Sequence, residues 1–195
     1  MSRRILVIQG HPDPAGHHFG HALAHSYLEG ARGAGHEVRL IEVAQLDFPL
    51  LRSQKEWDHG ELPASLNAAQ QSIAWAGHIV LFFPLWLGDM PALLKGFLEQ
   101  VGRPGFAFKP GQGGLLQAKG LTGRSARVVV TMGMPSLIYR FYFRAHSVRA
   151  LERSILGFMG ISPVDESLIG RVDSMADSER VSWLARMRRL GREGL

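Results

Sequence analysis

The 195-residue sequence contains no cysteine, which excludes disulfide bonds, thiol catalysis and zinc–thiolate sites. It also lacks a long apolar run, and the first apolar stretch, residues 5–8, is too short for a signal-peptide core or a membrane span. We therefore expect a cytoplasmic protein without direct membrane insertion. Its composition, 46% hydrophobic and 20% charged, is that of a globular protein, and we expect a single domain over residues 1–195.

Several familiar site motifs are missing as well. Neither a Walker phosphate loop nor a G-x-G-x-x-G turn follows the first apolar stretch. Residues 133–137 do not form the G-x-S-x-G turn of a serine hydrolase. Asp13 and Asp89 stand alone, so no pair of carboxylates marks the ends of the expected strands. No phosphate loop, catalytic serine or pair of catalytic carboxylates can therefore be assigned.

The formal net charge of +5 admits nucleic acid, a membrane surface or an anionic small ligand as a partner. No aromatic and basic platform and no nucleic-acid motif accompanies the charge, so we expect no nucleic-acid partner. The pattern of the densest basic group, interleaved with acidic residues, is typical of the solvent-facing side of a terminal helix. This group consists of Arg180, Arg186, Arg188, Arg189 and Arg192.

Short apolar stretches alternate with segments of helical spacing, which predicts an α/β fold. The expected sheet is a doubly wound, five-stranded parallel sheet with helices on both faces, because its central strands have no alternating polar residues. A long irregular connection is expected at residues 48–62, and an excursion with a short hairpin at 102–123. The expected strands are 4–9, 38–43, 78–83, 125–131 and, at an edge, 164–169, and the expected helices are 19–34, 63–76, 91–101, 137–159 and 175–190.

Candidate site residues follow three of these strands, whose carboxyl ends should meet at one ligand-binding edge. The first loop offers backbone amides, the start of a helix at Phe19 and several imidazoles, which suits a phosphate. The loop after the third strand carries Trp86 among apolar residues and suits a flat aromatic ligand. A metal held by His11, Asp13 and nearby histidines is a rival interpretation, although no clean ligand spacing is visible.

A phenol and an imidazole form a further candidate pair. Tyr139 and His146 are seven residues apart, so a continuous helix would place them two turns apart on one face. Such a pair could hydrogen-bond a carbonyl ligand and supply it with a proton. The alternative is that both are packing residues of an aromatic segment.

The stretch FFPLWLGDMPALLKG, residues 82–96, resembles a segment of the flavodoxin-like NAD(P)H:quinone oxidoreductases. That family includes the DT-diaphorase type and the flavin-binding ancillary subunits of bacterial potassium-efflux systems. His11 at the end of the first strand and Thr131-Met132-Gly133-Met134 after the fourth also match, and the resemblance covers about residues 4–170.

The resemblance implies a non-covalently held flavin, a homodimer and a ping-pong reaction. NADH or NADPH would reduce the flavin, and a quinone-like acceptor would then take the electrons from the same pocket. FMN is expected, with FAD as the alternative, because the chain lacks the long C-terminal part that covers an adenosine in larger relatives. A rival function is a flavin-binding regulatory subunit with little turnover, whose partner surfaces would be residues 48–62 and 102–123.

The resemblance also assigns site residues by position. His18-Phe19-Gly20 stands where the family usually has Ser-Phe-Asn, so the phosphate contacts differ here. Tyr139 and His146 would stabilise charge on the reduced flavin or protonate the acceptor. The implied flavin contacts are His11, His18 and Phe19 at the phosphate and ribityl chain; Pro84, Leu85, Trp86, Leu87 and Gly88 along the ring; and Thr131, Gly133 and Met134 beside it.

Overall fold

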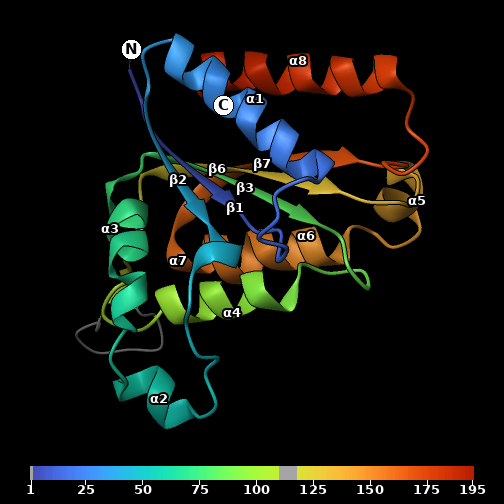
Figure 1. Cartoon of the computed structure of the whole chain (residues 1–195). Coiled ribbons are helices and arrows are strands. Elements are labelled where there is room, and N and C mark those ends of the chain that lie inside the picture. The colour runs from blue at the N-terminus through green and yellow to red at the C-terminus, as the bar shows by residue number, and fades with distance from the viewer. Residues whose placement is uncertain (1, 110–117) are drawn as a thin grey trace.

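The computed structural model of the protein describes residues 2–109 and 118–195 and contains a five-stranded parallel sheet between two layers of helices (Figure 1). The strand order is β2-β1-β3-β6-β7, and every neighbouring pair is parallel. The predicted doubly wound α/β fold is confirmed, with the fifth strand at an edge. The strands are β1 (Arg4–Gln9), β2 (Glu37–Glu42), β3 (His78–Pro84), β6 (Arg124–Thr131) and β7 (Ile161–Ile169).

Two hydrophobic cores hold the helices to opposite faces of the sheet. Side chains alternate along a strand, so Ile5 and Val7 of β1 pack beneath one layer while Leu6 and Ile8 face the other. Helices α1 (Phe19–Gly33) and α8 (Asp177–Glu193) cover the first face (Figure 1). The opposite face carries α3 (Asn67–Trp75), α4 (Ala92–Val101), α6 (His146–Ala150) and α7 (Gly157–Met159).

Two glycines bring α1 and α8 into backbone contact. A Cβ atom on Gly30 would lie 1.9 Å from the carbonyl oxygen of Arg188, and a Cβ atom on Gly191 would lie 2.1 Å from that of Tyr27. A methyl group would overlap either oxygen, so only glycine permits this approach. The close contact fixes the position of α8 relative to the helix that follows β1.

The connection between β2 and α3 is more ordered than predicted, because it contains the short helix α2 (Gln54–His59). The Ser53 hydroxyl accepts a hydrogen bond from the Glu56 amide at 3.2 Å, and the Glu56 carboxylate accepts one from the Arg52 amide at 2.9 Å. Ser53 and Glu56 have the Ser-x-x-Glu spacing of a capping box. Short helical turns at Val43–Gln45 and Ala64–Leu66 flank this connection.

The predicted short hairpin is present as β4 (Phe108–Lys109) and β5 (Ala118–Lys119), which pair in antiparallel fashion. The rest of the glycine-rich stretch that joins them, residues 110–117, lies outside the described residues. Within residues 2–109 and 118–195, we find no helix that combines the length and the apolar character of a membrane span.

Residues 137–159 are largely helical and end before Gly160, as predicted, but a turn at residues 142–145 interrupts the helix. Helix α5 (Ser136–Phe141) ends early, and Arg144 and Ala145 adopt left-handed backbone angles, with φ of 53° and 48°. Two successive left-handed residues cannot continue a right-handed helix, so the chain turns before α6 begins. A π-helical stretch (Leu151–Leu156) then joins α6 to α7.

Candidate functional site

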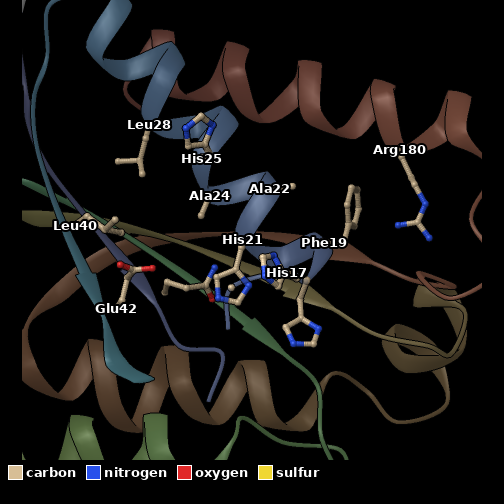
Figure 2. A pocket seen from close by; sticks show the side chains of 13 residues that line it. His17, Phe19, His21, Ala22, Ala24, His25, Leu28, Leu40, Glu42 and Arg180 are labelled. Atoms are coloured by element: carbon tan, nitrogen blue, oxygen red, sulfur yellow. The ribbon is translucent and has the colours of Figure 1, made fainter. Parts of the chain in front are cut away.

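The carboxyl ends of β1, β3 and β6 border one open cavity of about 610 Å³. The loops after all three strands contribute to it, as the sequence predicts for this edge of the sheet. A second open cavity of about 630 Å³ adjoins it around the start of α1 and shares four residues with it (Figure 2). The predicted flavin contacts that line the first cavity are His11, His18, Phe19, Pro84, Leu85, Trp86, Thr131 and Gly133.

Hydrogen bonds within the first loop hold the start of α1 at this cavity. The Gln9 side chain donates to the Gly20 carbonyl at 3.1 Å and accepts from the His11 amide at 3.1 Å. No side chain caps α1 at His18, and its first turn contains no acidic residue. The first amides of a helix lack intrahelical partners, so this end presents N–H groups and the positive end of the helix dipole to an anion.

Three histidine rings cluster where β1 meets α1. His11 stacks on His18 with ring centroids 3.9 Å apart, and His21 lies 5.2 Å from His11. Burial, followed by the neighbouring rings of His18 and His21, lowers the pKa of His11 to about 4. The pKa of His21 is also lowered, mainly by burial. His11 is therefore uncharged at neutral pH in the free protein.

Asp13 supplies the negative charge beside this cluster. Its carboxylate lies 2.6 Å from Nε2 of His18 and accepts a hydrogen bond from the Ala15 amide at 2.9 Å. That backbone bond, followed by the contact with His18, lowers the pKa of Asp13, so the carboxylate is ionised. Within the described residues, no three His, Cys, Asp or Glu side chains are arranged to hold a metal ion.

The loop after β3 folds into a tight turn at the cavity rim. Reciprocal backbone hydrogen bonds of 2.8 and 3.0 Å join Trp86 and Asp89, and Leu87 and Gly88 both have positive φ, 49° and 82°. Two positive φ values define a type I′ turn, in which glycine and asparagine are usual. Trp86 lines the cavity with its ring half exposed, whereas Leu87 is fully exposed at the tip.

The sequence analysis misses three residues that line the cavity from the C-terminal part of the chain: Val172, Asp173 and Arg180. Arg180 of α8 donates to the Val172 carbonyl at 2.5 Å, and its guanidinium lies 5.1 Å from the Phe19 ring centroid (Figure 2). The solvent-facing interpretation is therefore wrong for Arg180. Only the packing of α8 on α1 distinguishes it from its basic neighbours, and no sequence signal marks it.

Asp173 lies beside Gly133 in the cavity lining. A Cβ atom at Gly133 would lie 2.8 Å from an Asp173 carboxylate oxygen. Met134, also a predicted flavin contact, is not among the lining residues; its side chain packs against the hydrophobic core, and its carbonyl accepts a bond from the Arg171 amide. Gly88 and Leu87 likewise do not line the cavity, since they form the tip of the turn.

The predicted arrangement of Tyr139 and His146 on one helical face is wrong, because the chain turns between them. Tyr139 is buried, and its hydroxyl lies 2.5 Å from the Ser147 hydroxyl and accepts from the Val148 amide at 3.3 Å. His146 is exposed at the start of α6, and neither side chain lines the cavity. Their catalytic role stays a prediction.

We expect the Tyr139→Phe substitution to lower the free energy of unfolding by about 1 kcal/mol, because Ser147 and Val148 lose a buried partner. Urea denaturation measures this loss. Ser147→Ala should have a similar effect, and the double variant should lose less than the sum of the two. Unchanged stability combined with lost flavin reduction would instead indicate that the phenol acts on the reaction.

The chain belongs to the family described as having a flavodoxin-like fold, whose model matches residues 3–190. The predicted family is thus confirmed. The chain is 28% identical over 186 residues to an uncharacterized NAD(P)H oxidoreductase of Haemophilus influenzae, covering 92% of this chain and 89% of the relative. It is 24% identical over 213 residues to an FMN-dependent NADH:quinone oxidoreductase of Macrococcus caseolyticus, covering 97% and 98%.

A solved structure has the same fold. The NAD(P)H:quinone oxidoreductase from Methanothermobacter marburgensis superposes with a TM-score of 0.81 at 24% identity, covering 99% of this chain and 97% of that one. At this identity the superposition establishes the fold, and the chemistry has to be argued from the residues of this chain.

Proposed function

We propose that this protein is a flavin-dependent NAD(P)H oxidoreductase that binds FMN and reduces a quinone-like acceptor. One observation carries the proposal. A single open cavity joins the uncapped start of α1, which suits a phosphate, to an apolar and aromatic loop, which suits a flat ring. The names of the relatives from Haemophilus influenzae and Macrococcus caseolyticus support the same activity.

The residues around the cavity fit a flavin at both ends. The amides at the start of α1 and the guanidinium of Arg180 suit the phosphate. FMN is the proposed flavin, and FAD is the alternative. Pro84, Leu85 and Trp86 supply an apolar wall for the ring. We further propose that five residues contact the ring once the loop after β3 closes over it. They are Leu87, Gly88 and Met134, with Thr131 and Gly133 on the wall formed by β6.

Flavin, if bound in this cavity, would supply the chemistry of hydride acceptance from a nicotinamide and electron transfer to an acceptor. The chain's own part is to bind the cofactor, orient it and exclude water from one of its faces. We propose that NADH or NADPH leaves this cavity before the acceptor enters it, which would give ping-pong kinetics. We propose that Tyr139 and His146, which lie outside the cavity lining of the free protein, would supply a proton to the acceptor, and that Tyr139 also holds α6 in place through the Ser147 hydroxyl.

We also propose that the working form is a homodimer. Large apolar side chains are exposed on and just after α5, beside the carboxyl end of β6. A second copy of the chain that covered them would remove this apolar surface from water. These side chains are Leu137, Ile138, Phe141, Tyr142 and Phe143.

The proposal is tested by adding FMN to the purified protein, desalting it and recording the absorbance spectrum. We expect a retained yellow chromophore that bleaches anaerobically with NADH or NADPH and recovers when a quinone is added. Flavin that is retained but reduced by neither nucleotide would favour the regulatory, flavin-binding alternative. Failure to retain either FMN or FAD would contradict both functions.

A further inference from the structure

Four imidazoles gather at the end of the cavity where α1 presents its free amides. His17 and His18 line the cavity, His11 stacks on His18, and His21 lies 5.8 Å from His18. Nδ1 of His21 is buried and, within the described part of the chain, has no hydrogen-bond partner. A site built from imidazoles differs from one built from fixed cations, because its charge depends on proton binding.

The permanently charged groups around this cluster are mostly negative. Asp13 lies in the same loop, Glu42 ends β2 beside His21, and Asp173 lines the cavity next to Gly133. The final helix, α8, contributes one cation, Arg180, to the cavity lining. Three carboxylates against one guanidinium leave a net charge of −2 when the imidazoles are neutral. A phosphate dianion is repelled by such surroundings unless the imidazoles gain protons.

Binding of a phosphate would shift this balance. In the free protein, burial and mutual repulsion lower the pKa of His11 to about 4 and lower that of His21. A dianion at the start of α1 favours the protonated imidazoles and raises both pKa values. Imidazole protonation therefore stabilises the complex with phosphate. This stabilisation is complete below the pKa of the imidazole in the free protein, and it is lost as the pH rises through the raised pKa of the imidazole in the complex.

We propose that His11, His18 and His21 form a proton-linked phosphate site, which binds the phosphate of FMN together with a proton and so retains FMN more tightly as the pH falls. This inference rests on the proposed function and adds a regulation of the same site. Acidification would load the protein with cofactor, and alkaline conditions would release it. Riboflavin, which has no phosphate, should bind without this dependence.

The test compares the dissociation constants of FMN and riboflavin, measured by quenching of flavin fluorescence from about pH 8.5 to about pH 6.5, above the second phosphate ionisation near 6. The ratio of FMN affinity to riboflavin affinity should rise as the pH falls, by at most about tenfold per pH unit for one linked proton. Calorimetric titration in two buffers with different ionisation enthalpies measures the proton uptake directly.

Two variants locate the proton. In His18→Asn, which removes the ring stacked on His11, the pH dependence of the ratio should weaken, and in His11→Asn/His21→Asn, which removes the two groups whose pKa the phosphate raises, it should be nearly lost. His59→Asn is the matched control, because His59 is an exposed residue of α2 remote from the cluster, and its ratio should follow the wild type. His18 is also exposed, so its single variant is expected to fold even if the double variant does not.

The outcomes separate this inference from the proposed function. A ratio that rises in the wild type and flattens in the variants supports the proton-linked site. A ratio that is independent of pH, or that keeps its slope in the variants, overturns the linkage while leaving FMN binding intact. Failure of FMN, FAD and riboflavin to bind at any pH overturns the proposed function itself.

Discussion

Replacing Gly191 with alanine is expected to lower the free energy of unfolding by about 3 kcal/mol, although alanine normally stabilises a helix relative to glycine. The new Cβ atom would lie 2.1 Å from the Tyr27 carbonyl oxygen and 3.0 Å from the Ala31 amide nitrogen. Both atoms belong to the backbone of α1, so no side-chain rotation relieves the overlap. The two helices must separate, which opens the core between them.

Gly33 provides the matched control. It is also a helical glycine of α1, but nothing lies within 4 Å of the Cβ atom that alanine would add. Gly33→Ala should therefore raise the free energy of unfolding by about 0.5 kcal/mol. Urea denaturation followed by circular dichroism measures both variants. Equal stability of the Gly191 variant and the wild type would contradict the backbone contact between α1 and α8.

The Arg180→Ala substitution is expected to weaken FMN binding by about 10- to 100-fold, the effect of losing a charge-assisted hydrogen bond to phosphate. Riboflavin should bind almost as well to the variant as to the wild type, because it has no phosphate. Fluorescence titration of the two flavins measures the difference. The expectation depends on the position of Arg180 on the cavity wall beside Phe19.

Arg186→Ala is the control for the loss of one positive charge from α8. Its guanidinium stacks on Trp183, 4.9 Å from the ring centroid, and it does not line the cavity. FMN binding should change little in that variant. If Arg180→Ala weakened FMN and riboflavin equally, its role would be to hold Phe19 in place rather than to contact the phosphate.

The sheet was predictable because its signal is local and strong. Strand β3 is a run of apolar β-forming residues that stops at Pro84, and helix α4 begins directly after Pro91. Helix α2 was also within reach of sequence analysis, since Ser53 and Glu56 have the capping-box spacing, but the mixed charge of the segment favoured an irregular interpretation. The family resemblance assigned flavin contacts to the cavity loops, whereas residue spacing alone left open whether these loops bind a ligand or only pack against their neighbours.

Two features could not be read from local sequence. Arg144 and Ala145 have no chemical preference for the left-handed conformation that ends the expected helix, so tertiary packing must impose it. Arg180 belongs to a basic group whose pattern is that of a solvent-facing surface. Its place at the cavity depends on how α8 lies on α1, and that depends on two glycines far apart in the chain.

The exposed turn after β3 has an evolutionary consequence. Leu87 holds a left-handed backbone that glycine or asparagine adopts with less strain, and its side chain is fully exposed in the protein alone. Burial within one copy of the chain therefore gives no reason for leucine at this position, whereas burial against a bound molecule would give one. We therefore expect selection for Leu87 to come from such a contact, and a lineage that no longer uses this loop to lose the leucine.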